Sequence, residues 1–600
     1  MAIPKFQQML FNRKTGERPE EVSRPADIEA PVTEKTANAQ DKEAGISDNA
    51  SDDAVPSPGV QTGIQKIQAV TLVWSKTSLA AVLCLLWLVT LTNGMRSSIL
   101  ASLTPYAISG WESHSLLTVI NIVSSAMVSA LYIPVAKLVD LWGRAEGWLF
   151  MVGLSTLGMI MMAASKNLAT YCAADVFYSV GFAGMNYILC VIAADITNLR
   201  NRGIAFAFTS SPYMITAFAG SKAAEQFLQK VDWRWGFGAF AIIVPFVASP
   251  VYFVLKAGMN KAEKQGLIVP SVASGRTPLE TAKHYLFEFD LPGVFLLAAG
   301  LTIFLLPFTL ASRAPNGWKS DYIIAMIIVG FVLMVLFALY QIYWAPKPFL
   351  KHQFLTDRTV IGACLLDLTY QMSYYCWNSY FTSFLQVVSN LGVAEAGYVN
   401  STFQVVSGVL LFIVGYLIRK TGYFRWLLFI GVPIYIFAQG LMIHFRKPNQ
   451  YIGYIVMCEI FISVGGSVFT LIMQLAVLAA VDHQHVAAAL AVLFIFGGIG
   501  GAVGNAISGA IWTNTFLPAL QRNLPTSELP NVAMIYGDLY TQLSYPVNSP
   551  ARIAIQESYG YAQTRMLAAG TGLMALCFIW VAMIRNYNVK TTTQTKGVVF

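Results

Sequence analysis

The sequence has 600 residues, of which 56% are hydrophobic and only 12% are charged, and its formal net charge is +8. A bilayer core about 30 Å thick is crossed by a helix of about 20 apolar residues, and apolar stretches of that length recur from about residue 77 onwards. This composition excludes a soluble globular protein and predicts an all-α membrane protein.

Residues 1–70 precede the first apolar stretch and differ from the rest of the chain. They are rich in Pro, Glu, Asp, Lys, Ser and Ala and poor in aromatic residues. Because such a composition cannot bury enough apolar surface to fold, we predict a disordered cytoplasmic tail. The tail lacks a basic stretch followed by a short apolar run, so no cleaved signal peptide is expected.

Fourteen predicted membrane-spanning segments follow this tail. They are centred on residues 77–98, 115–136, 147–165, 172–196, 203–221, 235–255, 291–311, 321–344, 359–387, 395–418, 426–444, 451–481, 487–512 and 563–585. With a cytoplasmic N-terminus, the inner loops carry more Lys and Arg than the outer loops. The positive-inside rule therefore places both ends of the chain in the cytoplasm, including a short tail over 587–600.

Two loops of the chain have related sequences. AKLVDLWGR follows the second span and contains Asp140, Gly143 and Arg144, and GYLIRKTGYFR follows the tenth span and places Arg419 and Gly422 at the offsets of Asp140 and Gly143. A tight turn between helices needs glycine, and charges there can bridge to neighbouring helix ends. These five residues are therefore candidate gating residues, which would latch the cytoplasmic side while the outer side is open.

This spacing resembles the loop signature of the major facilitator superfamily. The second copy departs from it because Arg419 stands where the signature has an acid. A basic turn that only obeys the positive-inside rule is the alternative for the first copy, but two copies in corresponding loops disfavour it. The resemblance implies a six-helix bundle over 77–255, a cytoplasmic loop and two linking helices over 256–358, and a second six-helix bundle over 359–586. Transporters built from repeated halves bind their substrate at the midplane between the halves.

A channel or a receptor is the rival class of membrane protein. Span thirteen contains FGGIGGAVGNAISG, in which Gly497 and Gly501, and Gly500 and Gly504, are pairs of small residues that let helices approach closely. Such contacts suit helices that slide or rock, although close static packing would use the same residues. No Walker loop, nucleophile elbow or metal-binding constellation is present in the sequence. We therefore expect that the protein does not hydrolyse ATP, that it is not an enzyme, and that it has no cofactor and no metal site.

Buried acids are the candidates for using an ion gradient. Asp367 lies inside span nine and Glu459 inside span twelve. A charged acid at the centre of a membrane helix costs about 2.5–3.5 kcal/mol, so such residues usually face a cavity and serve transport. We predict Asp367 and Glu459 to be proton-coupling residues, with a structural partnership as the alternative. Asp175 and Asp195 lie near the ends of span four, where solvated or capping roles are favoured.

Span nine also contains YQMSYYCWNSYF, a polar and aromatic run in the middle of a membrane helix. Steps of three and four place Asp367, Gln371, Tyr374, Asn378 and Phe381 on one face, whereas Leu365 and Leu368 lie on the other. An interfacial aromatic belt would lie at the helix ends instead. Aromatic rings with hydroxyl or N–H groups suit a bulky amphipathic ligand. The candidate substrate-binding residues of this run are Tyr370, Gln371, Tyr374, Tyr375, Trp377, Asn378 and Phe381.

Three regions make the resemblance more specific. YYCWNSYFTSFLQVV, the GYLIRKTGYFR turn and VAAALAVLFIFGGIGGAVGNAISGAIW look like fungal siderophore–iron transporters, as does the long outer loop 513–562 with SYPVNSPARIAIQESYGYAQ. The resemblance implies uptake of a ferric hydroxamate siderophore, of the triacetylfusarinine C or the ferrichrome type, together with protons. It also implies that Tyr559 contributes to cargo binding from the outer loop, for which we predict a lid or gate without regular structure.

The expected partners are therefore the ferric siderophore, protons and the lipid bilayer. We expect no nucleic-acid partner, and we expect the protein to be a monomer. The siderophore would keep its iron, because no cluster of oxygen ligands is visible in the sequence. The expected location is the plasma membrane, with endosomal vesicles as an alternative. A proton-coupled drug exporter would use the same fold in the opposite direction, and a receptor that senses the cargo without transporting it is a further alternative.

Overall fold

The computed structural model describes residues 62–267, 277–346, 354, 356–482 and 485–590, and every regular element within these ranges is helical. A first half consists of α3 (Lys76–Ser109), α4 (Leu117–Leu141), α5 (Arg144–Ala163), α6 (Leu168–Asp195), α7 (Leu199–Ser210), α8 (Pro212–Gln226) and α9 (Trp233–Lys264). A second half consists of α15 (Arg358–Asn378), α16 (Phe381–Val387), α17 (Val393–Asn400), α18 (Thr402–Thr421), α19 (Arg425–Phe445), α20 (Ile452–Ala479), α21 (Val486–Asn523), α24 (Pro550–Leu573) and α25 (Cys577–Met583).

The linking region lies between the two halves in sequence. It comprises α10 (Pro278–Glu288), α11 (Leu291–Leu305), the single turn α12 (Pro307–Leu310) and α13 (Asp321–Leu339). Helices α11 and α13 pack against each other, and α11 also packs against α4 of the first half. Most large side chains of α13 remain exposed, and its candidate span has a mean hydropathy of 3.0, as a helix in contact with lipid should have.

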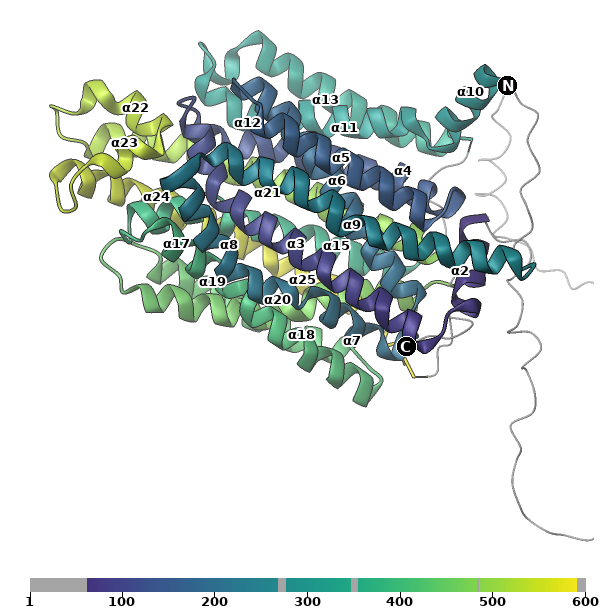
Figure 1. The fold of residues 1–600 in the computed structure, drawn as a ribbon. Helices are drawn as coiled ribbons and strands as arrows, with labels where there is room; N and C mark the ends of the chain where they lie inside the picture. Colours follow the sequence, from purple (N-terminus) through teal and green to yellow (C-terminus); the bar gives the residue numbers. More distant parts are fainter. Residues whose placement is uncertain (1–61, 268–276, 347–353, 355, 483–484, 591–600) are drawn as a thin grey trace, which may run out of the picture. The chain divides into compact units, whose positions relative to one another are not determined.

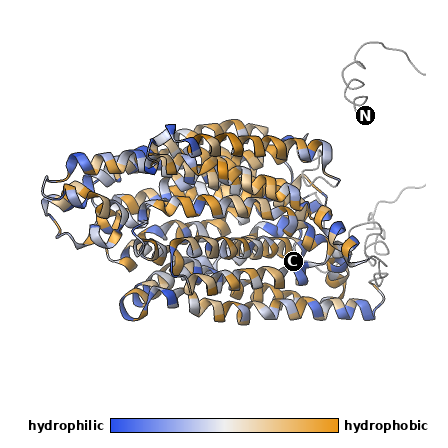
Figure 2. Ribbon diagram, turned by 90° about the horizontal axis from the view of Figure 1, so that it is seen from above, coloured by the Kyte–Doolittle hydropathy of each residue, from blue (hydrophilic) through white to orange (hydrophobic). Residues whose placement is uncertain are grey.

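Twelve helices of the described residues are long and apolar enough to cross a membrane. The other two predicted spans, 203–221 and 359–387, fall on the interrupted pairs α7–α8 and α15–α16. Pro212 begins α8, because proline lacks the N–H that a continuous helix would need there. Tyr380 separates α15 from α16 with a left-handed backbone (φ 58°). In Figure 2, hydrophobic residues cover the length of the helices and hydrophilic residues gather mainly toward the ends.

Two predictions about irregular segments are corrected by the structure. The tail predicted to be disordered through residue 70 contains α2 (Thr62–Val73), which packs against α4 and α9, whereas 1–61 lie outside the described residues. Lys66 donates to the carbonyl oxygen of Trp142 (3.0 Å), and Gly63 lies so close to the carbonyl of Asp140 that a Cβ would clash. This packing, rather than the composition of the segment, stabilises the helix.

The predicted structureless loop 513–562 is also shorter and more ordered than expected. Helix α21 continues to Asn523 and α24 begins at Pro550, and the connection between them contains α22 (Val532–Gly537) and α23 (Leu539–Ser544). Figure 1 shows α22 and α23 at one end of the helix bundle and α2 at the other. We refer to these two ends as the α22–α23 end and the α2 end.

Small residues form the closest helix contacts in the bundle. A Cβ on Gly500 would clash with the backbone oxygen of Leu368 in α15, and a Cβ on Gly504 would lie 2.7 Å from the backbone oxygen of Met372 in the same helix. The predicted close approach of span thirteen is therefore present, between α21 and α15. Between the two halves, a Cβ on Gly415 of α18 would lie 3.1 Å from the carbonyl carbon of Gly203 in α7, and one on Gly498 of α21 would clash with Ser129 of α4.

Candidate functional site

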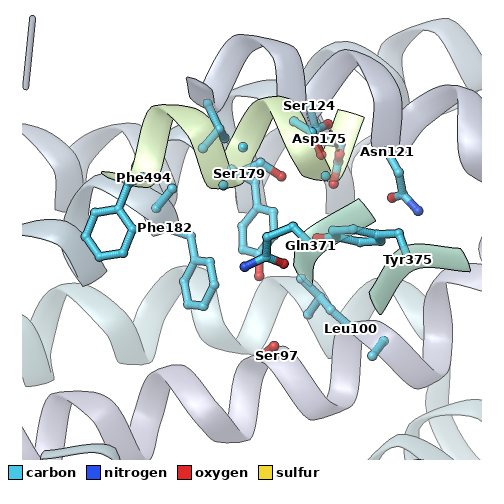
Figure 3. Close-up of a pocket in the computed structure, with 18 of the residues that line it drawn as sticks. Ser97, Leu100, Asn121, Ser124, Asp175, Ser179, Phe182, Gln371, Tyr375 and Phe494 are labelled. Atoms are coloured by element: carbon cyan, nitrogen blue, oxygen red, sulfur yellow. Dashed lines mark hydrogen bonds between the residues drawn. The ribbon is translucent and has the colours of Figure 1, made fainter. Parts of the chain in front are cut away.

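A cavity of about 460 Å³ lies between the two halves, and we call it the central cavity. Helices α3, α4 and α6 line it from the first half, and α15 and α21 line it from the second. Figure 3 shows Gln371 and Tyr375 of α15 near the middle of the site, with Asp175 and Ser124 on one side and Ser97 and Leu100 on the other. Its polar lining residues are Ser97, Thr104, Asn121, Ser124, Ser125, Tyr132, Asp175, Tyr178, Ser179, Asp367, Gln371 and Tyr375.

Each half contributes one carboxylate to the central cavity. Asp367 of α15 accepts a hydrogen bond from Gln371 one turn later (3.4 Å), and its carboxylate lies against Gly497 of α21, where a Cβ would clash. Asp175 of α6 accepts a hydrogen bond from Ser124 of α4. Neither acid forms an ion pair within the described residues. A carboxylate without a cationic partner inside a membrane protein is costly when it is ionised.

The predicted polar face of span nine is divided between two environments. Gln371 and Tyr375 line the central cavity together with Asp367. Tyr370, Tyr374 and Trp377 instead pack in a cluster with aromatic residues of α18, α19 and α20 (Phe403, Tyr435 and Phe469), at ring-centroid distances of 5.3–6.2 Å.

The remaining residues of that face lie beside the cluster. Asn378 donates to the hydroxyl of Tyr374 (3.2 Å). Helix α15 ends at Asn378, so the continuous face predicted through Phe381 stops there, and Phe381 is buried beneath the guanidinium of Arg446 (4.2 Å to the ring centroid). Leu368, on the opposite side, packs against Gly500 of α21.

Glu459 lies outside the lining of the central cavity. Its side chain is fully buried in α20, and neither carboxylate oxygen makes a well-formed hydrogen bond with a described residue, although the backbone N–H of Phe403 faces it. Arg446 is a charged group that acts on it from the end of α19. Glu459 and Asp175 are each the eighth residue of a 28-residue helix, so they occupy equivalent positions in the two halves.

The gating residues of the first loop form a buried ion cluster at the α2 end. Arg144 pairs with Asp195 of α6 (3.0 Å) and with Asp140 of α4 (3.3 Å), and it also donates to the carbonyl oxygen of Val139 (3.0 Å). The turn before it requires glycine, because Gly143 has φ 123°. We call Asp140, Arg144 and Asp195 the Arg144 cluster.

The second loop has the turn without the ion cluster. Gly422 ends α18 in the left-handed region (φ 82°), and its carbonyl oxygen accepts from the N–H of Val589 (2.9 Å). Arg419 is exposed, and it forms no ion pair with any residue that the structure describes. The structure therefore brings the three charged residues Asp140, Arg144 and Asp195 together and leaves Arg419 apart.

The halves contact each other at both ends of the central cavity. Toward the α2 end, the hydroxyl of Tyr187 in α6 donates to the carbonyl oxygen of Ala487 in α21 (2.7 Å). Toward the α22–α23 end, Tyr106 of α3 donates to Gln386 of α16. The hydroxyl of Tyr380 also donates to the carbonyl oxygen of Ser115 (3.0 Å). These bonds must break on one side for the cavity to open there.

The connection between α21 and α24 covers this second set of contacts. Ser115 donates to the carbonyl oxygen of Tyr536 (2.5 Å), and the N–H of Leu539 donates to Ser109 (3.1 Å). Tyr559 lies beneath the connection, fully buried in α24, and donates to Gln542 (2.7 Å). Its ring contacts Trp512 at 5.1 Å, and Trp512 stacks on Tyr380 at 4.1 Å. In the structure, Tyr559 is thus packed against Trp512 and Gln542, and it does not line the central cavity.

One ionisable residue of the connection has a perturbed environment. Glu528 accepts hydrogen bonds from the hydroxyl of Tyr545 (2.7 Å) and from the side chain of Asn531 (3.1 Å). Both bonds favour the ionised carboxylate and therefore lower the pKa of Glu528 from its ordinary value. These two hydrogen bonds connect Glu528 to Asn531 nearby and to Tyr545 at the far end of the connection.

The first-half wall of the cavity was largely missed by the sequence analysis. Asp175, Ser179 and Phe182 recur at steps of four and three, which is the spacing of one helical face, and this pattern was the available signal. The described residues contain no group of three or more His, Cys, Asp or Glu side chains that could hold a metal ion. The hydroxyl, amide and aromatic side chains that line the central cavity can contact an organic molecule through hydrogen bonds and ring contacts.

Comparisons with known proteins agree with this architecture. The model of the Major Facilitator Superfamily matches residues 86–505. Two solved transporters share the fold: the human organic anion transporter MFSD10 (TM-score 0.51, 11% identity, 84% of this chain and 99% of that chain) and a bacterial homolog of the human lysosomal transporter Spinster, inward-facing and unoccupied (TM-score 0.52, 14% identity, 85% and 98%).

Curated relatives are far more similar in sequence. The chain is 79% identical over 600 residues to the siderophore iron transporter mirB of Emericella nidulans, with 99% of each chain covered. It is 60% identical over 574 residues to MFS siderochrome iron transporter 1 of Gibberella zeae (95% and 94% covered) and 56% identical over 591 residues to MFS siderochrome iron transporter B of Aspergillus fumigatus (98% and 95% covered). These relatives are transporters and not enzymes. The chain belongs to the major facilitator superfamily and, within it, to the fungal siderophore iron transporters.

Proposed function

We propose that the protein imports ferric hydroxamate siderophores across the plasma membrane by alternating access, in symport with protons. The observation that carries this proposal is the central cavity, which lies between the halves and is lined by one carboxylate from each. The names of the relatives supply the class of cargo, as the relatives are siderophore iron transporters.

The central cavity has properties that a ferric trishydroxamate requires. Its volume of about 460 Å³ falls within the range of about 300–1,000 Å³ that is common for small-molecule sites. Such a cargo presents carbonyl and amide acceptors, and the side chains of Gln371, Tyr375, Asn121 and several serines can donate to them. The cargo keeps its iron, since its own hydroxamate oxygens already coordinate the metal.

We assign proton coupling to the buried acids Asp367 and Glu459, and Asp175 joins them because it lines the cavity. Each of these carboxylates lacks a salt-bridge partner among the described residues. Protonation from outside removes a costly buried charge and favours the cargo-bound, closed state. Release of the protons to the cytoplasm resets the carrier.

The gates of this cycle are the contacts at the two ends of the cavity. We assign the α2 end to the cytoplasm, following the excess of Lys and Arg in its loops, so both chain ends are cytoplasmic. The Arg144 cluster then latches the inner gate, and the aromatic layer with Tyr380, Trp512 and Tyr559 forms the outer gate. The protein acts as a monomer in this scheme, because one chain supplies both walls and both gates.

The decisive experiment is uptake of radioactive iron from a panel of ferric siderophores in cells that lack their own siderophore transporters. We expect accumulation from at least one ferric hydroxamate of the triacetylfusarinine C or ferrichrome type, and we expect a protonophore to abolish it while ATP is held constant. Cells without the protein are the control, and uptake by Asp367→Asn is measured beside them at the same surface amount as the unmodified protein.

A drug exporter of the same fold is the alternative function, and the same cells distinguish it. Loss of a toxic drug from the cells without uptake of any ferric siderophore would establish export and reject import. Uptake that persists unchanged in the presence of the protonophore would reject proton symport while leaving siderophore import in place.

A further inference from the structure

A second cavity, of about 260 Å³, lies on another side of α3, and we call it the side cavity. Helices α3 and α8 line it from the first half, and α17 and α18 line it from the second. None of its described lining residues is charged, whereas hydroxyl and amide groups are abundant. The lining residues with polar side chains are Ser97, Ser98, Ser102, Tyr213, Ser221, Asn400, Ser401 and Gln404.

The two cavities are neighbours around the same helix. Ser97 and Ala101 line both of them, whereas Leu100 and Thr104 line only the central cavity, and Ser98 and Ser102 line only the side cavity. Successive residues of an α-helix are turned by about 100°, so the two sets occupy adjacent sectors that overlap at Ser97 and Ala101. The central and side cavities therefore share part of their wall, at Ser97 and Ala101 of α3.

The side cavity offers unused hydrogen-bonding capacity. The side-chain oxygen of Asn400 is buried and accepts no hydrogen bond from a described residue. The amide nitrogen of Gln404, in its favoured orientation, donates to the backbone oxygens of Asn400 and Ser401 at 3.2–3.3 Å, which leaves its own oxygen as an acceptor. An orphaned buried polar atom costs free energy, and a ligand that presents a matching donor or acceptor removes that cost.

A buried positive charge lies beside the central cavity. Arg96 precedes Ser97, and its guanidinium lies over the rings of Tyr178 (5.0 Å) and Phe182 (4.5 Å) of the central cavity. Two of its three guanidinium nitrogens have no hydrogen-bond partner in the described part of the chain. Such a charge in a low-dielectric wall repels ammonium groups and attracts carbonyl oxygens.

We propose that the side cavity is a cargo subsite that binds a neutral arm of the siderophore, such as an acylated amide or ester group, while the ferric hydroxamate core occupies the central cavity. This inference rests on the proposed function. The side cavity then sets which peripheral groups are accepted, because its size and its uncharged polar lining favour an acylamide and disfavour an ammonium group. Residues of both halves touch the arm, so binding of the arm also favours the closed arrangement of the halves.

The experiment compares two ferric trishydroxamates with the same core, one with neutral acylamide arms and one without arms. Ala217→Leu fills the side cavity, and Gln404→Leu removes an amide at nearly constant volume. We expect Gln404→Leu to raise the KM for the armed cargo about two- to tenfold, which is the effect of one lost hydrogen bond, and Ala217→Leu to raise it at least as much. The KM for the compact cargo stays within about twofold of the unmodified value.

Matched controls make the result specific. Ala219→Leu changes the same helix by the same volume at an exposed position, and we expect no effect on either cargo. Uptake of the compact cargo by the side-cavity variants reports that they fold and reach the surface. An armed analogue that carries free ammonium groups should be taken up less well than its acylated counterpart by the unmodified protein.

The outcomes separate this inference from the proposed function. Equal shifts in KM for the armed and the compact cargo, or no shift in either variant, would overturn the subsite while siderophore import stands. Failure of the unmodified protein to take up either ferric trishydroxamate would overturn both. A selective loss of affinity for the armed cargo, absent in Ala219→Leu, supports the subsite.

Discussion

The two halves of the molecule share a loop turn but not its charges. Gly143 and Gly422 both adopt positive φ angles after a helix that contacts the other half. Only the first turn leads into a buried ion cluster, in which Arg144 bridges Asp140 and Asp195, whereas Arg419 in the second is exposed. The comparison teaches that the two repeated turns share their backbone geometry but not their electrostatics.

Removal of the latch should have the largest effect. Arg144→Ala removes the ion-pair partner that the buried carboxylates of Asp140 and Asp195 share, and breaking a buried pair in this way costs about 3–5 kcal/mol. We expect turnover to fall by at least about tenfold, since each 1.4 kcal/mol corresponds to a factor of ten, while equilibrium binding of cargo changes less. Initial uptake rates and binding to membranes, both normalised to surface amounts, measure the two quantities.

The counterpart in the second half is the control for this prediction. Arg419→Ala removes an exposed charge without an ion pair among the described residues, and surface charges of this kind contribute about 0–1 kcal/mol. We expect its turnover to remain within about twofold of the unmodified protein. If Arg419→Ala slows transport as strongly as Arg144→Ala, the asymmetry between the halves has no functional meaning.

Substitutions of the buried acids test whether proton coupling depends on one half or on both. Asp367→Asn and Asp175→Asn each remove one titratable group from the central cavity, and Glu459→Gln removes the equivalent of Asp175 in the second half. We expect Asp367→Asn to lose the response of uptake to the proton gradient and to lower uptake about tenfold or more. Uptake at a series of external pH values, with and without a protonophore, measures this response. Full, gradient-dependent uptake by Asp367→Asn would transfer the coupling site to Asp175 or Glu459.

A smaller effect should distinguish neighbouring tyrosines within α15. Tyr375 lines the central cavity, whereas the hydroxyl of Tyr374 accepts from Asn378 at the edge of the aromatic cluster. Tyr375→Phe removes a hydroxyl available to cargo, so we expect KM to rise about two- to tenfold. Tyr374→Phe should leave KM nearly unchanged, with Leu365→Ala as a control for packing. A larger KM effect for Tyr374→Phe would mean that the aromatic cluster, and not the cavity wall, contacts the cargo.

The smallest effect concerns the connection between α21 and α24, an element of the second half. Because the pKa of Glu528 is lowered by the donors Tyr545 and Asn531, these bonds stabilise the folded connection above the unfolded pKa of about 4.3. The stabilisation is lost as the pH falls through the lower, folded pKa. We expect amide exchange in this connection, corrected for intrinsic rates, to increase below about pH 4. Glu528→Gln should remove this dependence, and an unchanged pH profile in that variant would contradict the assignment.

The sequence predicted the fold class and the turn better than it predicted the cavity. Gly143, Gly422 and the buried Asp367 follow from local chemistry, since a tight turn and an acid inside an apolar stretch are both visible in one sequence. The first-half wall was underrated because Asp175 lies near the edge of its predicted span, and only tertiary packing shows that this depth meets the cavity. The break at Tyr380 carries no glycine or proline signal, and only the structure shows that Tyr380 stacks on Trp512 and donates to Ser115 there.

The predictions about the irregular segments were wrong for a related reason. Composition predicted disorder for 62–70 and an unstructured loop over 513–562, but α2, α22 and α23 are stabilised by docking onto other parts of the bundle. Tyr559 illustrates the consequence. A tyrosine in a predicted loop suggests an accessible hydroxyl, whereas the structure buries Tyr559 against Trp512 and Gln542.

The consecutive glycines Gly497 and Gly498 have a mechanical consequence. Gly497 lies directly against the carboxylate of Asp367 in its own half, and Gly498 lies directly against Ser129 of the opposite half. Two successive residues of α21 therefore connect the carboxylate of Asp367 to the contact between the halves, with no side chain of their own between them. Because glycine has no side chain that could yield, a shift of α21 at this point acts directly on the side chains of Asp367 and Ser129.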